Sequence, residues 1–335
     1  MKRIVICLLC ALGVSAAMFA GTKEDDARAS RELVEAGTDG ITDWAIVKIP
    51  AASIRTSGRH SAEMSTQAVL GTPVRVIEKG DSWWNVQTPD GYTGWIPSSS
   101  VAGKSAAEMK AWRSAPKLVV NSPFQVRVYE TPGDDSRVDG VVTDLVNGCI
   151  VELKEQTPDG FCKVALPDGR SGYINGKYMT AIADWADQPF DADGIIRMAS
   201  SMMGTPYLWG GTSTKALDCS GLAKVSYYNN GRILMRDASQ QAVTGRRIEA
   251  KDWPTCRKGD LLFFGNADTG RVTHVAIYDR DGGYVHSSGR VKYNSVDPKS
   301  DLYLSTPFLH AVRIDGYEGT PGITKVIDHP WYFNK

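Results

Sequence analysis

Leu217-Asp218-Cys219-Ser220-Gly221-Leu222 follows a glycine-rich aromatic segment, Thr205-Pro206-Tyr207-Leu208-Trp209-Gly210-Gly211. The apolar periodicity after Cys219 predicts a helix that ends near Asn229, so the thiol stands at a helix N-terminus. The free N–H groups and partial positive charge at such an end lower a thiol pKa and can hold an oxyanion. The stretch is therefore typical of an activated cysteine nucleophile.

Two histidines follow on runs that alternate like β-strands. His274 lies in Thr-His-Val-Ala-Ile-Tyr and His286 in Tyr-Val-His-Ser-Ser-Gly. One histidine can act as a base for the thiol, and the second can orient the first. A buried structural cysteine with two satisfied histidines is the alternative. The capping residues Asp218 and Ser220, which flank the thiol, favour catalysis.

The segment from about Asp187 to Asp315 resembles the NlpC-type family of bacterial cell-wall cysteine peptidases. The shared pattern is Tyr-x-Trp-Gly-Gly, then Asp-Cys-Ser-Gly, then a strand histidine and a second polar residue. The resemblance implies a permuted papain-like α+β fold. It also implies Cys219 as nucleophile, His274 as base, His286 as the residue that orients the base, and Tyr207 as a hydroxyl beside the thiol.

Composition narrows the possible functions. The 335 residues carry 38 basic and 38 acidic side chains, and no basic patch or acidic tail stands out. Nucleic acid is therefore not an expected partner. The sparse cysteines and histidines have no zinc spacing, so no metal or other cofactor is expected. We expect a monomer. Cys149 and Cys162 lie near each other in a strand-turn-strand region, and their pairing is left open.

Residues 1–20 have the pattern of a signal peptide. Lys2 and Arg3 precede an apolar run that ends in small residues near Ala20, which predicts export and a mature chain starting near Gly21. An uncleaved membrane anchor is the competing interpretation. No later segment is long and apolar enough to span a bilayer, so no stable membrane insertion is expected. The predicted location is periplasmic or extracellular.

An internal repeat organises the first half of the chain. Residues 83–96 align without gaps on residues 161–174, and Val, Pro, Asp, Gly, Gly and Ile recur in register. Each copy reads as a strand, a Pro-Asp-Gly turn and a second strand. The units resemble bacterial SH3-like barrels. The expected order is a signal peptide (1–20), barrel 1 (41–102), a helical linker (103–115), barrel 2 (116–183) and the peptidase domain (184–335).

The two copies differ at positions that bear on function. Tyr92 of the first copy is Arg170 in the second, so the barrel itself does not require a tyrosine there. Residues 61–71, which include Glu63, have no clear counterpart in the second copy. Ordinary loop drift, with Glu63 as a solvated carboxylate, is one explanation.

The whole-chain order resembles the γ-D-glutamyl-L-diamino-acid endopeptidases, also called dipeptidyl-peptidase VI. The resemblance includes Glu-Met-x-Thr-Gln-x-x-x-Gly and Gly-Tyr-x-Gly-Trp in the first barrel. It implies that this barrel closes one end of the cleft, where an acidic residue and a tyrosine bind the free amino terminus of the substrate. The substrate-binding residues implied are Glu63, Tyr92, Asp218, Ser220, Asp237 and Ser239.

The implied substrates are peptidoglycan stem peptides that begin with a free L-Ala, cleaved between γ-D-Glu and a diamino acid during muropeptide turnover. Three alternatives remain open. The chain could be a wall-lytic endopeptidase acting on intact peptidoglycan, a non-catalytic wall-binding protein, or an acyltransferase with the same thiol chemistry.

Overall fold

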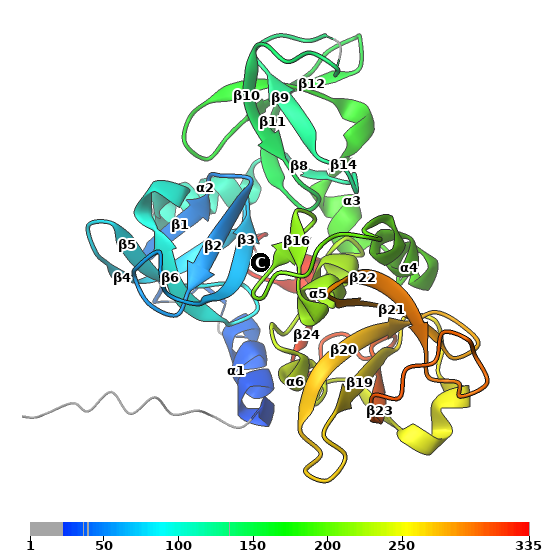
Figure 1. Cartoon of the computed structure of the whole chain (residues 1–335). Helices are drawn as coiled ribbons and strands as arrows, with labels where there is room; N and C mark the ends of the chain where they lie inside the picture. Colours follow the sequence, from blue (N-terminus) through cyan, green and yellow to red (C-terminus); the bar gives the residue numbers. More distant parts are fainter. Residues whose placement is uncertain (1–22, 36, 39, 134, 335) are drawn as a thin grey trace, which may run out of the picture.

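The computed structural model describes residues 23–35, 37–38, 40–133 and 135–334. The predicted signal peptide lies outside this part of the chain. The first described element is helix α1 (Lys23–Glu35), which lies below the first β-sheet in Figure 1. Two all-β units and a mixed α+β unit follow, as predicted. Among the described residues, no helix combines the length and the apolar character needed to cross a bilayer.

The two all-β units have the same topology. The first sheet has the order β3-β2-β6-β5-β4-β1-β7 and the second β10-β9-β13-β12-β11-β8-β14, so each strand has a counterpart seven numbers later. The first sheet comprises β1 (Asp43–Val47), β2 (Ala51–Arg55), β3 (Met64–Val69), β4 (Pro73–Lys79), β5 (Trp83–Gln87), β6 (Thr93–Pro97) and β7 (Val101–Ser105). The second comprises β8 (Lys117–Val120), β9 (Val126–Tyr129), β10 (Val141–Leu145), β11 (Ile150–Gln156), β12 (Phe161–Ala165), β13 (Ser171–Asn175) and β14 (Met179–Ala181).

The sequence repeat occupies the same place in both sheets. Trp84 pairs with Ile96 in the first, and Cys162 pairs with Ile174 in the second. The turn glycines Gly91 and Gly169 have φ of 84° and 90°, a conformation that costs other residues a steric penalty. The supposed insertion at 61–71 does have a counterpart, because β3 corresponds to β10. Sequence comparison missed this match because the two edge strands share no side-chain pattern.

The helix between the two sheets is shorter than the predicted helical linker of residues 103–115. Helix α2 spans Ala106–Ser114, and Ser105 forms a capping box with Glu108. Gly103, Lys104 and Ser105 belong to strand β7 instead. A Ser followed three residues later by Glu is the signal that fixes this helix start. Short 3-10 helices directly follow strands β6, β13, β18 and β24, at Ser98–Ser100, Gly176–Tyr178, Ala250–Thr255 and Val326–Asp328.

The α+β unit packs helices against a six-stranded sheet of order β18-β23-β19-β20-β21-β22. These helices are α4 (Ala192–Ser201), α5 (Cys219–Tyr228) and α6 (Ala238–Gln241), whereas α3 (Ile182–Asp187) contacts β8 and β14 of the second sheet. The strands are β18 (Arg246–Glu249), β19 (Leu261–Gly265), β20 (Val272–Tyr278), β21 (Gly283–Ser288), β22 (Arg290–Ser295) and β23 (Phe308–Arg313). Two short pairs lie outside this sheet, β15 (Thr212–Ser213) with β16 (Ala216–Leu217), and β17 (Arg232–Leu234) with β24 (Ile323–Lys325).

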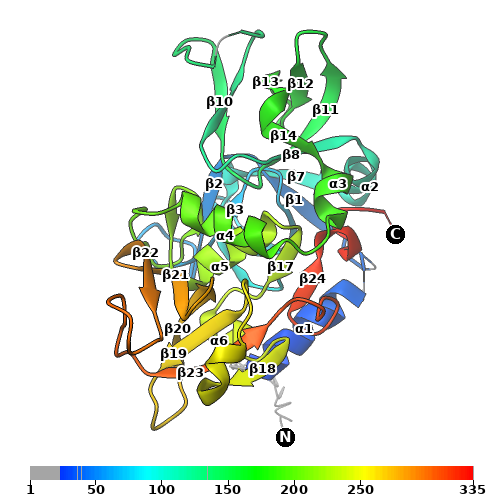
Figure 2. The same ribbon diagram turned by 90° about the vertical axis from the view of Figure 1, so that its right-hand side faces the viewer.

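The C-terminal tail, for which the sequence predicts no role, joins the three units (Figure 2). Trp331 and Tyr332 are 0% and 1% exposed. They pack in one apolar cluster with Trp44 of the first sheet, Val119 of the second and Trp185 of α3. At about 25 cal/mol per Å² of buried apolar surface, such aromatic side chains stabilise the junction substantially. The arrangement of the units is thus fixed by a shared core.

Candidate active site

The nucleophile candidate lies at the first position of a capped helix. Asp218 is the N-cap of α5, and its Oδ1 accepts from the N–H of Gly221 at 2.7 Å. Its Oδ2 accepts from the N–H of Gly210 at 3.0 Å. Asp218 therefore holds the glycine-rich loop against the helix start, and Cys219 is fixed where the two meet.

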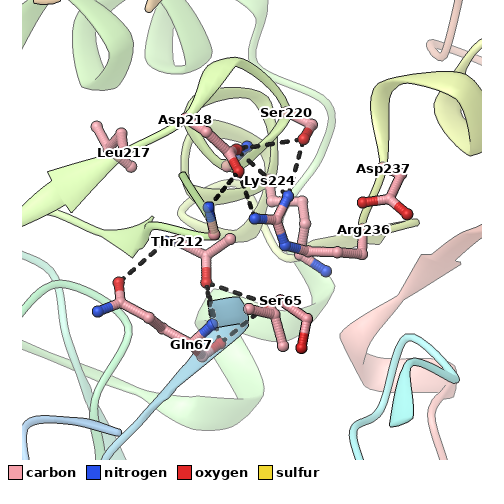
Figure 3. Close-up of polar contacts among 12 residues, drawn as sticks. Ser65, Gln67, Thr212, Leu217, Asp218, Ser220, Lys224, Arg236 and Asp237 are labelled. Carbon is pink, nitrogen blue, oxygen red and sulfur yellow. Dashed lines mark hydrogen bonds and ion pairs between the residues drawn. The ribbon is translucent and has the colours of Figure 1, made fainter. Parts of the chain in front are cut away.

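Arg236, whose partner the sequence did not predict, completes this network (Figure 3). Its side chain is 2% exposed, and it forms an ion pair with Asp218 and donates to the Ser220 hydroxyl at 2.8 Å. Asp218 and Ser220 are each 4% exposed. Both side chains are already hydrogen-bonded within the protein, so these two residues would contact a substrate through their backbone. Arg236 precedes α6, and no local motif marks it as a partner of Asp218.

A chain of hydrogen bonds runs along the catalytic sheet from His274. His274 Nε2 lies 2.7 Å from His286 Nδ1, and His286 Nε2 lies 2.9 Å from Asn294 Oδ1. Asn294 Nδ2 donates to the carbonyl of Leu302 at 3.0 Å, which fixes the orientation of the amide. Asn294 was not predicted, although its place on β22 opposite β21 puts it on the same sheet face as His286.

This chain determines the tautomers of both histidines. Because Asn294 Oδ1 can only accept, His286 carries its proton on Nε2 and accepts at Nδ1. His274 must then donate from Nε2, which leaves its Nδ1 without a proton. The arrangement presents an imidazole nitrogen that can accept a proton, held by a relay of two further side chains.

Three contacts bring the relay to the thiol. The backbone N–H of Val275, the residue after His274, hydrogen-bonds the Cys219 thiol. The Ser287 hydroxyl, next to His286, donates to the Leu217 carbonyl at 3.1 Å. Tyr207 is half-buried, and the pKa of its hydroxyl is raised to about 12, first by burial and then by the neighbouring Cys219. The structure thus places the backbone next to His274 and the Tyr207 side chain at Cys219, while His286 is hydrogen-bonded to His274.

Burial shifts the pKa values of the thiol and of the imidazole in opposite directions, in each case against the charged form. Burial, followed by the charge of Asp218, raises the pKa of the Cys219 thiol to about 11. Burial, followed by His286 and Lys292, lowers the pKa of His274 to about 3. The backbone N–H of Ser220 at the helix start lowers the thiol pKa, as expected, but burial and the charge of Asp218 outweigh this contribution.

The first sheet packs directly on the loop before the nucleophile. Gln67 of β3 exchanges hydrogen bonds with Thr212, from Gln67 N to Thr212 Oγ1 at 3.0 Å and from Thr212 N to Gln67 Oε1 at 3.0 Å. A Cβ on Gly210 would lie 2.4 Å from the carbonyl oxygen of Met64, so only glycine fits there. Glu63 immediately precedes Met64 and is exposed. Glu63 thus directly precedes edge strand β3, next to the residue that contacts Gly210.

Two further contacts tie the Pro-Asp-Gly turn of the first sheet to the peptidase unit. The Tyr92 hydroxyl donates to Asp237 Oδ2 at 3.3 Å, and Asp90 forms an ion pair with Lys224 of α5. Burial is the largest cause that raises the pKa of Asp237. The structure therefore joins Tyr92 and Asp237, while Ser239 follows on α6 with a half-buried side chain.

The other histidines and cysteines lie outside this cluster. His310 Nε2 donates to the Ala242 carbonyl at 3.0 Å, and His60 packs edge-on against Trp83. Cys149 and Cys162 are both free and buried. In the part of the chain that the structure describes, no group of three or more His, Cys, Asp or Glu side chains is placed to hold a metal ion.

Comparison with known proteins agrees with this architecture. Residues 204–313 match the NlpC/P60 family, and residues 54–101 match the bacterial dipeptidyl-peptidase SH3 domain. Dipeptidyl-peptidase 6 of Lysinibacillus sphaericus is 30% identical over 270 residues, which cover 77% of this chain and 94% of that protein. The γ-D-glutamyl-L-lysine dipeptidyl-peptidase of Bacillus cereus is 28% identical over 264 residues, 76% of each chain.

A solved structure shows the same fold. The crystal structure of an NlpC/P60 family protein from Bacillus cereus superposes with a TM-score of 0.67 at 23% identity, covering 81% of this chain and 99% of that one. The chain belongs to the NlpC/P60 family of cysteine peptidases.

Proposed function

We propose that this protein hydrolyses the bond between γ-D-glutamate and a diamino acid in peptidoglycan stem peptides that carry a free N-terminal L-Ala. Relatives named γ-D-glutamyl-L-lysine dipeptidyl-peptidase and dipeptidyl-peptidase 6 support the bond and the dipeptide product. The observation that carries the amino-terminal requirement is the packing of β3 on the nucleophile loop, since Thr212 and Gln67 join a barrel to the cleft.

In the proposed reaction, His274 Nδ1 takes the proton of the Cys219 thiol as the sulfur attacks the γ-carbonyl carbon. His286 and Asn294 hold the resulting imidazolium, which is costly in this buried place until the proton moves on. The oxyanion lies at the N-terminus of α5 near the Tyr207 hydroxyl. His274 then protonates the leaving amine, and a water deprotonated by His274 hydrolyses the thioester.

The closed end of the cleft would select the substrate. Glu63 would pair with the ammonium of L-Ala, and Tyr92, held by Asp237, would line the same end. A buried ammonium needs a partner, so this pocket favours substrates with a free amine and disfavours acylated, glycan-linked stems. We infer a role in trimming released muropeptides outside the cytoplasm, in keeping with the signal-like residues 1–20.

The test is mass spectrometry of L-Ala-γ-D-Glu-diaminopimelate after incubation with the purified protein, with the N-acetylated peptide and a Cys219→Ala variant as controls. Release of L-Ala-γ-D-Glu from the free peptide alone supports the proposal. Equal cleavage of both peptides would favour a wall-lytic endopeptidase, for which intact sacculi are the next substrate. Cleavage of neither would refute a peptidase of this specificity.

A further inference from the structure

Two basic side chains lie on the edge strand beside the histidine relay. In the antiparallel register of β21 and β22, His286 is opposite Lys292 and Ser288 is opposite Arg290. Alternate residues of a strand share one face, and residues directly opposite each other lie on the same face of a sheet. Arg290 and Lys292 therefore point to the face on which Asn294 bonds His286.

The start of β22 also borders the glycine-rich loop that precedes Cys219, residues 205–211. Arg290 forms a β-bridge with Pro206, and the N–H of Tyr207 donates to the Gly289 carbonyl at 3.0 Å. Tyr207 is the residue whose hydroxyl neighbours the thiol. Arg290 thus lies on the edge strand beside the segment that carries Tyr207, and Lys292 lies on the same strand directly opposite His286.

The two cations have no acidic partner in the described part of the chain. Arg290 is exposed and Lys292 is half-buried, and neither forms an ion pair with a carboxylate of residues 23–35, 37–38, 40–133 or 135–334. Other cations near the cleft differ in this respect. Lys224 holds Asp90, and Arg236 holds Asp218. A half-buried lysine without a carboxylate partner, directly opposite His286 on the neighbouring strand, is suited to an anionic ligand.

The charge of Lys292 acts on the relay itself. It contributes, after burial, to the lowered pKa of both His274 and His286. An unneutralised cation at this place opposes formation of the imidazolium that the reaction requires. A carboxylate bound to Lys292 would remove that opposition at the moment the substrate is in place.

We propose that Lys292, assisted by Arg290, binds a carboxylate of the substrate beside the histidine relay and makes a free carboxylate near the scissile bond a determinant of specificity. This inference rests on the proposed function. A γ-linked substrate offers two such groups. One is the α-carboxylate of D-glutamate, which the γ-linkage leaves free, and the other is the carboxylate of the diamino acid that leaves.

Three peptides and two variants test the inference. The peptides are L-Ala-γ-D-Glu-L-Lys, the same peptide with its C-terminal carboxylate amidated, and the same peptide with the D-glutamyl α-carboxylate amidated. Steady-state kcat/KM is measured for each with the native enzyme, with Lys292→Gln, and with Lys299→Gln. Lys299 is an exposed lysine on the segment after the same strand, so this variant controls for the loss of one positive charge.

We expect Lys292→Gln to lower kcat/KM on the parent peptide about tenfold, the usual effect of one charge-assisted hydrogen bond. On the peptide that lacks the recognised carboxylate the same substitution should not lower kcat/KM, because it removes a cation that is left unneutralised there, and this peptide identifies which carboxylate is bound. Lys299→Gln should match the native enzyme on all three peptides. An unchanged melting temperature shows that each variant is folded.

The inference is overturned if Lys292→Gln loses the same factor on all three peptides, or if it loses nothing on the parent peptide. Failure of the native enzyme to cleave the parent peptide would instead contradict the proposed function. The two failures are therefore distinguishable in one set of measurements.

Discussion

At the scale of single residues, the site is organised by an amide rather than by a carboxylate. Asn294 accepts from His286 and donates to the Leu302 carbonyl, so its orientation is set by the backbone of a neighbouring segment. A neutral third member fixes the tautomer of His274 without adding a charge that would hold the imidazolium permanently. Burial is the largest cause both of the raised pKa of the Cys219 thiol and of the lowered pKa of His274.

Replacing Asn294 by Ala should therefore lower kcat about ten- to a hundredfold with little change in KM, because the base loses its orientation while the substrate contacts remain. Asn294→Asp should recover most of kcat. The added carboxylate favours the protonated ring, so this variant should also move the acidic limb of the pH–rate profile to higher pH. Steady-state kinetics from pH 5 to 9 would check both results.

A purely structural role for Asn294 would give a different outcome. Both variants would then lose activity in proportion to their loss of melting temperature, and the pH–rate profile would keep its shape.

At the residue scale, the sequence predicts some members of the candidate site and not others. Cys219, His274 and His286 could be predicted because a helix-start thiol and two strand histidines form a recognisable pattern. Arg236 and Asn294 could not, because their partners are Asp218 and His286 of other elements. Nothing local distinguishes them from an ordinary buried arginine and a strand asparagine.

At the scale of elements, helix α5 depends on its cap. Asp218 satisfies the N–H of Gly221 and of Gly210, and Arg236 neutralises its buried charge. The acidic cap would otherwise carry a desolvation cost of several kcal/mol. One ion pair thus fixes the helix start, the glycine-rich loop and the position of the thiol.

Arg236→Met should reduce the free energy of unfolding by about 3 kcal/mol, since it leaves Asp218 buried and unpaired. The double variant Arg236→Met with Asp218→Asn removes both charges and should recover a large part of this loss. Denaturant unfolding followed by tryptophan fluorescence would measure both. Equal stability of the single and the double variant would show that the ion pair does not support the cap.

The predicted ends of helices and strands agree with the structure where the apolar pattern in the sequence is long. The helix after Cys219 was expected to end near Asn229, and α5 ends at Tyr228. The strand-like run Thr-His-Val-Ala-Ile-Tyr around His274 lies within β20, which spans Val272–Tyr278. Strand β22 has no comparable signal in the sequence, because it carries basic and polar side chains on one face and little apolar pattern. Edge strands of this kind are recognised by their partner strands rather than by their own sequence.

At the scale of the whole molecule, the first sheet and the C-terminal tail meet at one buried histidine. His329 is 0% exposed, and its Nε2 donates to the carbonyl of Pro89 in the Pro-Asp-Gly turn at 2.9 Å. Burial lowers the pKa of His329 to about 4. The residue that joins the tail to the first sheet must therefore stay neutral.

This has a consequence for stability in acid. Between pH 6.5 and about 4 the unfolded chain binds a proton at His329 that the folded protein does not, so stability falls as the pH falls through this window. The contribution of this one residue is about 3 kcal/mol across the window. His329→Gln, which keeps a donor for Pro89, should show a smaller loss of stability from pH 7 to pH 4.

Thermal unfolding at closely spaced pH values would check this expectation, with His60→Gln as the control because His60 is exposed. Parallel curves for the native protein and His329→Gln would contradict it.

The whole-molecule scale shows what a sequence repeat leaves undetermined. The two barrels were recognisable, and their common topology follows from one pattern of strands and turns. The different roles of the two barrels were not recognisable, because they depend on which barrel packs against the peptidase unit. Asp90 of the first turn is buried against Lys224, whereas Asp168 at the equivalent position pairs with Arg170 of its own turn. The tail gave no signal because its aromatic side chains are buried only by the three units together.

The central claim is that the first barrel selects a free amino terminus through Glu63. The most direct test compares kcat/KM for L-Ala-γ-D-Glu-L-Lys with that for its N-acetylated form, in the native enzyme and in Glu63→Gln. We predict that the native enzyme prefers the free amine by about a hundredfold or more, and that Glu63→Gln loses about tenfold or more on the free peptide alone. An equal loss on both peptides, or no preference in the native enzyme, would contradict the claim.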